Sequence, residues 1–146
     1  GVGKVLAVAE WFPNQGGQAS DTFYQSFKAA FPKPEHDYVH MRMQGMMVAL
    51  VHALSAAGQY AQGDQVDAYQ LALALEKTDV SVAGHRMLMR VADHQIEQPL
   101  VVAVMDKVGK PGVRFDTEGS GFGFRVVQRL SAQQAALPTN CSMVRP

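Results

Sequence analysis

Two histidines four residues apart are the first candidates for metal chemistry in this sequence. His36 and His40 flank Asp37, and this spacing on one helix would place both imidazoles on a single face, where they could hold a metal ion. However, Pro34 closely precedes the pair, and no third ligand is evident near it. The favoured interpretation is therefore a pair of solvated histidines at a helix start, and we predict no metal site.

An adjacent acid and base, Asp93 and His94, suggest a second kind of chemistry. A carboxylate that orients an imidazole is part of hydrolytic triads. Adjacent residues of an extended segment point to opposite faces, however, and no Gly-x-Ser-x-Gly motif accompanies the pair. We predict a structural turn instead, in which Asp93 accepts hydrogen bonds from local backbone amides.

A glycine-rich stretch, Gly119-Ser120-Gly121-Phe122-Gly123, has the composition of a phosphate-binding loop. It leads into an extended segment rather than a helix, so no helix N-terminus is aligned to hold a phosphate. A hairpin turn is the predicted structure.

Composition limits the kinds of partner that the protein can have. The chain has 146 residues, 47% of them hydrophobic, which is enough for one modest core, and 13 basic residues balance 13 acidic ones. Nothing in this balance attracts nucleic acid or an anionic membrane surface. No apolar run approaches the ~20 residues of a membrane span. Since Gly1 leads straight toward a strand, we expect that any export signal was removed or lay upstream.

The first element expected from the sequence is a short strand over residues 4–12. Its apolar run ends at Pro13, and the pattern is typical of a buried strand in a parallel sheet. A single strand needs neighbours, which must come from the tail, from another subunit or from upstream sequence.

Three helices are expected after this strand. The first covers residues 20–31 and ends before Pro32; the second covers 37–57; the third covers 64–78, with Asp64 as its cap. In the second helix, apolar residues recur three or four apart and predict its buried face: Val39, Met43, Met46, Leu50 and Leu54. Gly45 lies inside this helix and suggests close packing of another backbone.

The second helix also carries a cluster of methionines at positions 41, 43, 46 and 47. Some of them belong in the core, but four methionines in seven residues cannot all face inward. The excess apolar surface needs a cover, either a missing sheet or a second copy of the chain, so we expect a homodimer if this chain is isolated.

After Asp79 the pattern changes from helical to extended. Strands are expected over residues 87–91, 99–108, 113–115 and 123–130. The predicted fold class is therefore α/β, in the order strand, three helices, then strands, with an incomplete sheet.

The segment from Arg90 to Leu100 and the ending from Pro138 to Pro146, together with this order of elements, resemble the C-terminal end of type I periplasmic substrate-binding proteins of branched-chain amino acid ABC transporters. The resemblance covers essentially the whole chain. Such proteins have two lobes and roughly twice this length, so the resemblance implies that this chain is only their C-terminal portion.

The resemblance also implies how the chain divides between the two lobes. Residues 1–11 would be a strand of the C-terminal lobe, 12–87 a helical segment of the N-terminal lobe, and 88–146 the returning strands and tail of the C-terminal lobe. Crossings between the lobes are expected near residues 11–13, 85–90 and 108–115. His94 would then pack on the hinge.

The function implied by the resemblance is capture, without catalysis, of a small amino acid or related carboxylate in the periplasm and its delivery to a membrane permease. No cofactor is implied. The family usually has a Tyr-Asp-Ala triplet in the second helix, whereas this chain has Met43-Gln44-Gly45, so no ligand role is transferred there. Two alternatives stay open: a ligand-sensing domain of the same fold in a regulator, and a small α/β enzyme.

Trp11 and Phe12 are the residues that we predict to contact the ligand. They end the first strand, and the carboxyl ends of parallel strands border the binding crevice in open α/β sheets. Cys141 is the only cysteine. By the resemblance, we expect its disulfide partner in the upstream part of the parent protein.

Overall fold

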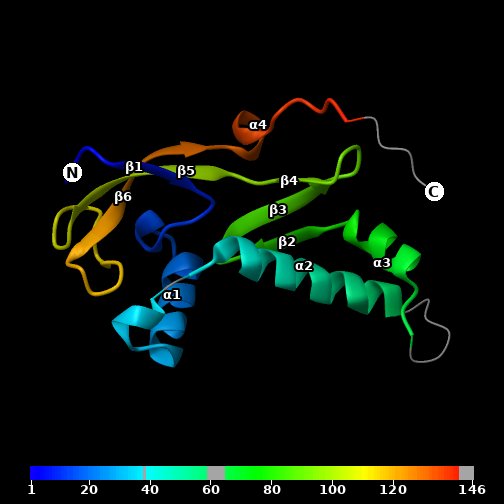
Figure 1. The fold of residues 1–146 in the computed structure, drawn as a ribbon, viewed down its shortest axis with the longest axis horizontal. Coiled ribbons are helices and arrows are strands. Elements are labelled where there is room, and N and C mark those ends of the chain that lie inside the picture. Colours follow the sequence, from blue (N-terminus) through cyan, green and yellow to red (C-terminus); the bar gives the residue numbers. More distant parts are fainter. Residues whose placement is uncertain (38, 59–64, 142–146) are drawn as a thin grey trace.

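The computed structural model describes residues 1–37, 39–58 and 65–141, which contain two small antiparallel sheets connected by helices (Figure 1). In the first sheet the strand order is β1-β5-β6, and in the second it is β2-β3-β4. The strands are β1 (Leu6–Ala9), β2 (Asp79–Val82), β3 (His85–Arg90), β4 (Gln95–Glu97), β5 (Leu100–Lys107) and β6 (Phe122–Leu130). This mixed architecture confirms the predicted α/β class.

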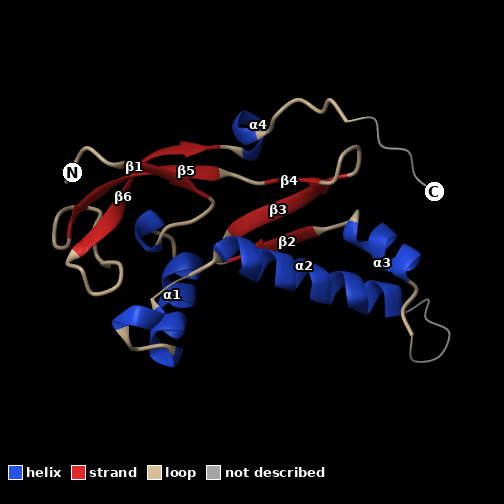
Figure 2. Cartoon of the chain, viewed as in Figure 1, coloured by secondary structure: helices blue, strands red, loops and turns tan. Residues whose placement is uncertain are grey.

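The helices are concentrated between β1 and β2. They are α1 (Gln18–Ala30), α2 (Met41–Gly58), α3 (Ala68–Leu75) and the short α4 (Ala132–Ala135), with 3₁₀ turns η1 (Pro13–Gln15) and η2 (Pro34–His36). Figure 2 shows α2 running beside β2, and α2 also packs against α3. No described helix combines the length and apolar character needed to cross a membrane.

Strand β1 pairs with a strand from the C-terminal part of the chain. This is one of the three sources of neighbours expected from the sequence. Strand β1 pairs with β5 from Leu6 opposite Val104 to Ala9 opposite Val101. The predicted direction and burial were wrong, because this pairing is antiparallel and Leu6 and Val8 are exposed. A short run of Ala and Val has the same pattern in both kinds of strand, so the sequence alone does not distinguish them.

Apart from Met41 at its start, the buried residues of helix α2 are small. Its buried face repeats every four residues and consists of Met41, Gly45, Ala49, Ala53 and Ala57. The predicted stripe was wrong, since Met43, Met46 and Leu54 are exposed. Small side chains allow the helix to lie close to the β2-β3-β4 sheet, which is why they face inward.

Gly45 shows how close this approach is. A Cβ atom at this position would lie 2.2 Å from Sδ of Met87, a buried residue of β3. The close neighbour of Gly45 is therefore a methionine side chain and not the expected backbone.

The remaining boundaries differ from the predictions by a few residues. Helix α2 begins at Met41 instead of 37, and α3 begins at Ala68 after an Asp67 cap, whose carboxylate accepts from Tyr69 N at 2.8 Å. The predicted cap, Asp64, lies outside the described residues. Strands β2 and β4 were missed, and the segment 113–115 is not a strand.

The polypeptide passes between the two sheets at two places. Residues 10–17 lead from β1 toward α1, and Gln98 and Pro99 connect β4 directly to β5. Residues 85–90, where a crossing between lobes is expected, form β3 of the second sheet. Residues 108–115 lie between β5 and β6, which are neighbours in the first sheet. The division into lobes stays a prediction.

Candidate functional site

A cavity of about 250 Å³ lies where β1 ends and the chain leaves the first sheet. Its lining comes from β1, η1, α1, the segment before α2, and the β5–β6 arm: Ala9, Trp11, Phe12, Pro13, Tyr24, Asp37, Val39, His40, Thr117 and Phe124. The volume is slightly below the ~300–1,000 Å³ of typical ligand pockets, so it suits a small organic solute or one end of it. Both predicted ligand residues, Trp11 and Phe12, line this cavity.

Trp11 is held by several contacts on one side of the cavity. Its indole Nε1 donates a hydrogen bond to Ser20 Oγ at 2.8 Å, and its ring meets Phe23 edge-on at 5.7 Å between centroids. Only 6% of the residue is exposed. The ring belongs to a cluster with Tyr24 and Met41, so it faces the helical part of the molecule.

Phe12 faces the other way. It packs on Phe124 at 5.1 Å between ring centroids and joins a cluster with Val101 and Ala103 of β5. The two successive aromatic rings thus anchor separate clusters, one on each side of the crossing. Since both rings also line the cavity, the cavity lies between these clusters.

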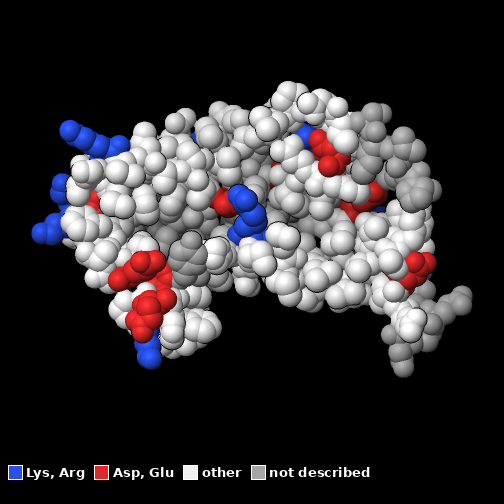
Figure 3. All heavy atoms as spheres, viewed as in Figure 1, with Lys and Arg blue, Asp and Glu red and all other residues white. Residues whose placement is uncertain are grey.

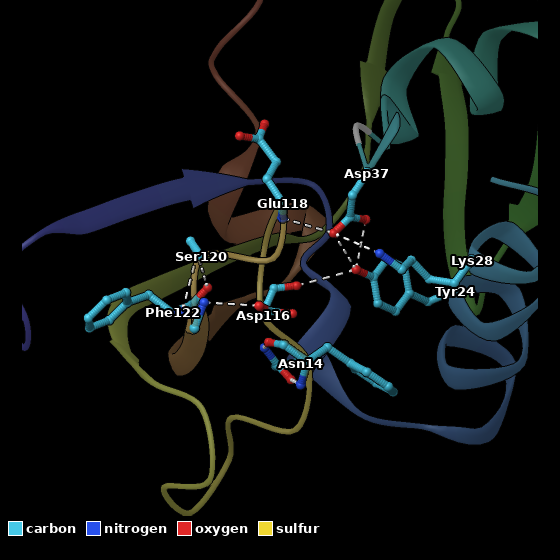
Figure 4. A network of polar contacts seen from close by, with 10 residues as sticks. Asn14, Tyr24, Lys28, Asp37, Asp116, Glu118, Ser120 and Phe122 are labelled. Atoms are coloured by element: carbon cyan, nitrogen blue, oxygen red, sulfur yellow. Dashed lines mark hydrogen bonds and ion pairs between the residues drawn. The ribbon is translucent and has the colours of Figure 1, made fainter. Parts of the chain in front are cut away.

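A buried carboxylate, Asp37, forms the polar part of the wall (Figure 4). The Tyr24 hydroxyl donates to its two oxygens at 2.8 and 2.9 Å, Lys28 Nζ lies 3.4 Å from Oδ2, and the Glu118 backbone N–H donates to Oδ2 at 3.0 Å. Burial, together with this hydrogen bond to Asp37, raises the pKa of Tyr24. Tyr24 therefore remains a proton donor at neutral pH.

The β5–β6 arm is held against η1 by the side chain of Asn14. Its Oδ1 accepts from the backbone N–H groups of Arg114 and Phe115, both at 2.9 Å, and its Nδ2 donates to the Phe115 carbonyl at 2.8 Å. Asn14 thus supplies hydrogen bonds to residues 114 and 115, which belong to no strand. Gly123 allows the close approach, because a Cβ there would lie 2.2 Å from the Phe115 carbonyl oxygen.

The histidines near this site are separated by the local fold. His36 ends η2, and His40 precedes α2, so the two imidazoles do not share a helix face. Asp37 between them turns toward Tyr24 and Lys28. Among the described residues, no group of three His, Cys, Asp or Glu side chains is arranged to hold a metal ion.

The Asp93–His94 pair forms the predicted turn. Asp93 Oδ1 accepts from the Gln95 backbone N–H at 3.2 Å and from Arg90 Nε at 2.8 Å. The Arg90 guanidinium holds the pKa of Asp93 well below its usual range. His94 Nε2 lies 2.9 Å from Glu76 Oε1. The contact between His94 and Glu76 joins the turn between β3 and β4 to the end of α3.

The glycine-rich stretch is also the predicted turn. The Thr117 carbonyl oxygen accepts from Ser120 N at 3.1 Å, and the Thr117 N–H donates to the Phe122 carbonyl oxygen at 2.8 Å. The chain then continues into β6.

On the face drawn in Figure 3, acidic and basic side chains form small separate groups. The formal net charge of the chain is zero.

Sequence reasoning missed four residues of the cavity wall that matter: Tyr24, Asp37, Thr117 and Phe124. Tyr24 was visible only as part of a helix, and Asp37 only as a companion of the histidines. Thr117 and Phe124 lie some 80 residues or more beyond these residues in the sequence, and no local pattern connects them.

The fold is an α/β module whose chain passes between two sheets, with a cavity at the first passage. A family model described as periplasmic binding protein matches residues 1–110 of the chain. Because the match covers well over half of the chain, the protein belongs to the periplasmic binding protein family. A search of curated proteins gave no match.

Solved structures show the same fold. A leucine-, isoleucine-, valine-, threonine- and alanine-binding protein from Brucella ovis, in a closed conformation, is 24% identical with a TM-score of 0.76 over 97% of this chain and 35% of its own. An ABC transporter substrate-binding protein from Sphaerobacter thermophilus has 13% identity and a TM-score of 0.61, covering 88% of this chain and 31% of its own.

A solute-binding protein from Rhodopseudomonas palustris, in complex with 3,4-dihydroxybenzoic acid, has 13% identity and a TM-score of 0.57 over 88% of this chain and 31% of its own. This chain therefore spans about a third of the length of the solved structures it matches, less than the half expected from the sequence.

Proposed function

We propose that this chain is the C-terminal part of an ABC transporter solute-binding protein that captures a small amino acid or related carboxylate in the periplasm and delivers it to a membrane permease. The observation that carries the proposal is the cavity lined by Trp11 and Phe12 at the passage between the sheets. A solute in this cavity would touch both the Trp11 cluster and the Phe12 cluster. Its binding would therefore favour one relative position of the two parts of the protein that carry these clusters. No reaction is required.

The division into lobes is part of this proposal. We assign residues 1–11 and the tail to one lobe and the helical segment to the other, because β1 pairs with β5 of the returning strands. The sequence placed the second boundary between residues 87 and 88. The change of sheet at Gln98 and Pro99 supports a boundary about ten residues later.

The wall of the cavity indicates which end of the solute it accepts. Trp11, Phe12, Tyr24 and Phe124 supply aromatic surface, and the carboxylate of Asp37 disfavours a second negative charge beside it. We assign the cavity to the apolar or aromatic end of the solute. Groups that bind a solute carboxylate are expected in the other two thirds of the protein. The named ligands of the relatives include both branched-chain amino acids and an aromatic acid.

Calorimetric titration of the full-length protein tests this function. We expect saturable binding of at least one member of a panel containing leucine, valine, phenylalanine and 3,4-dihydroxybenzoate. Trp11→Ala and Phe12→Ala should each weaken it by about tenfold or more, as expected for loss of a buried aromatic contact. Phe31→Ala is the matched control, because Phe31 is an exposed aromatic residue outside the cavity. Equal effects of all three substitutions would contradict the assignment.

A further inference from the structure

Asp37 connects two parts of the chain that no sheet joins. Tyr24 and Lys28, which bind its carboxylate, belong to α1, whereas Glu118 belongs to the loop between β5 and β6 (Figure 4). The Asp37 side chain is only 2% exposed. A carboxylate buried to this extent is stable only while its donors stay in place.

The loop at Glu118 has a strained backbone. Glu118 has a φ of 56°, in the left-handed region that a residue with a side chain rarely adopts, and Gly119 follows with a φ of 68°. The loop also sits tightly on the segment before Asp37, since a Cβ at Gly119 would lie 3.3 Å from Pro34. The hydrogen bond from Glu118 to Asp37 offsets part of this strain.

The groups that Asp37 holds are also parts of the cavity wall. Tyr24 lines the cavity from α1, and Thr117, the residue before Glu118, lines it from the loop. The Tyr24 hydroxyl additionally lies 3.4 Å from the Asp116 carbonyl oxygen. One buried carboxylate thus holds together two neighbouring parts of the cavity wall, one from α1 and one from the loop between β5 and β6.

We propose that Asp37 is a positioning residue of the cavity, which holds Tyr24 and the Thr117–Glu118 segment in place and so sets the shape that the solute meets. The effect on solute affinity rests on the proposed function. The effect on the shape of the cavity does not, and it is measurable without a solute.

The test compares Asp37→Asn and Tyr24→Phe with the wild-type chain. Asp37→Asn removes the charge at nearly constant volume, and Tyr24→Phe keeps the ring while removing the donor, so it serves if Asp37→Asn fails to fold. Glu35→Gln is the matched control, because Glu35 is an exposed acid in η2, two residues from Asp37.

Two readouts need no solute. Amide exchange at Glu118 should accelerate about tenfold in Asp37→Asn, as expected for loss of one charge-assisted hydrogen bond. Trp11 is the only tryptophan of the chain and lines the cavity, so acrylamide quenching of its fluorescence should increase in both variants and not in the control. Unchanged exchange and quenching in folded Asp37→Asn would overturn the proposal.

A third readout is solute affinity, measured on the full-length protein. We expect about a tenfold loss for Asp37→Asn, mainly from faster dissociation. Unchanged affinity with altered exchange would reduce Asp37 to a structural residue and overturn its positioning role. If the wild-type protein binds no solute, the proposed function fails, while exchange and quenching still decide whether Asp37 sets the cavity wall.

Discussion

Replacing Gly45 with alanine should destabilise the protein, although alanine is the better helix former. In an open helix, Gly→Ala stabilises by up to about 1 kcal/mol. Here the new Cβ would lie 2.2 Å from Sδ and 2.8 Å from Cε of Met87, which is only 2% exposed and packs with Ala49 and Val80. Overpacking of a filled core costs about 1–3 kcal/mol, so we expect a net loss of about 1 kcal/mol.

Urea unfolding followed by circular dichroism measures this change through the midpoint at constant m-value. In a Met87→Ala background the added methyl group has room. There Gly45→Ala should increase the free energy of unfolding instead of lowering it. Gly58→Ala, at the open end of the same helix with no atom within 4 Å, is the control and should not destabilise. Destabilisation of equal size with and without Met87 would refute the packing argument.

Three further outcomes are expected. Asn14→Ala removes the side-chain partner of three part-buried hydrogen bonds to the backbone of Arg114 and Phe115, and we expect a loss of about 2 kcal/mol in urea unfolding; a change near zero would contradict this role. Arg90 lowers the pKa of Asp93, so ionised Asp93 stabilises the fold above its unfolded pKa of about 4 and this contribution is lost as pH falls through the lowered pKa. The difference in unfolding free energy between the wild type and Asp93→Asn should therefore be constant from about pH 7 to 5 and shrink below about pH 4; a difference that grows on acidification would show the opposite sign. Finally, the exposed methionines of α2 should let the isolated chain self-associate, so its sedimentation coefficient should rise with concentration; a constant monomer value would argue against it.

Local patterns predicted the coarse order of one strand, three helices and then strands, but they missed β2, β4 and α4. Val- and Met-rich runs located β3, β5 and β6, and the helix-stop signals at Pro32 and Gly58 placed two helix ends within a residue or two. Side-chain size misled the reasoning at α2. Large apolar residues normally mark the buried face, but this helix lies so close to β2 and β3 that only small side chains fit between them.

The site was predictable only in part. Trp11 and Phe12 follow the end of β1 and line the cavity. The rule for parallel strands does not apply here, because β1 pairs antiparallel with β5, and contact of both rings with a ligand stays a prediction. Asp37 and Thr117 meet there through a loop that returns from far along the chain, and such long-range contacts leave no periodic signal. The direction of β1 was also out of reach, since it depends on which strand becomes its neighbour.

The crystal structure of the full-length protein with its tightest-binding solute tests the central claim most directly. We expect the apolar end of the solute within van der Waals distance of both Trp11 and Phe12, with Asp37 still bound to Tyr24 and Glu118. A solute bound elsewhere, with both aromatic rings out of contact, would contradict the account.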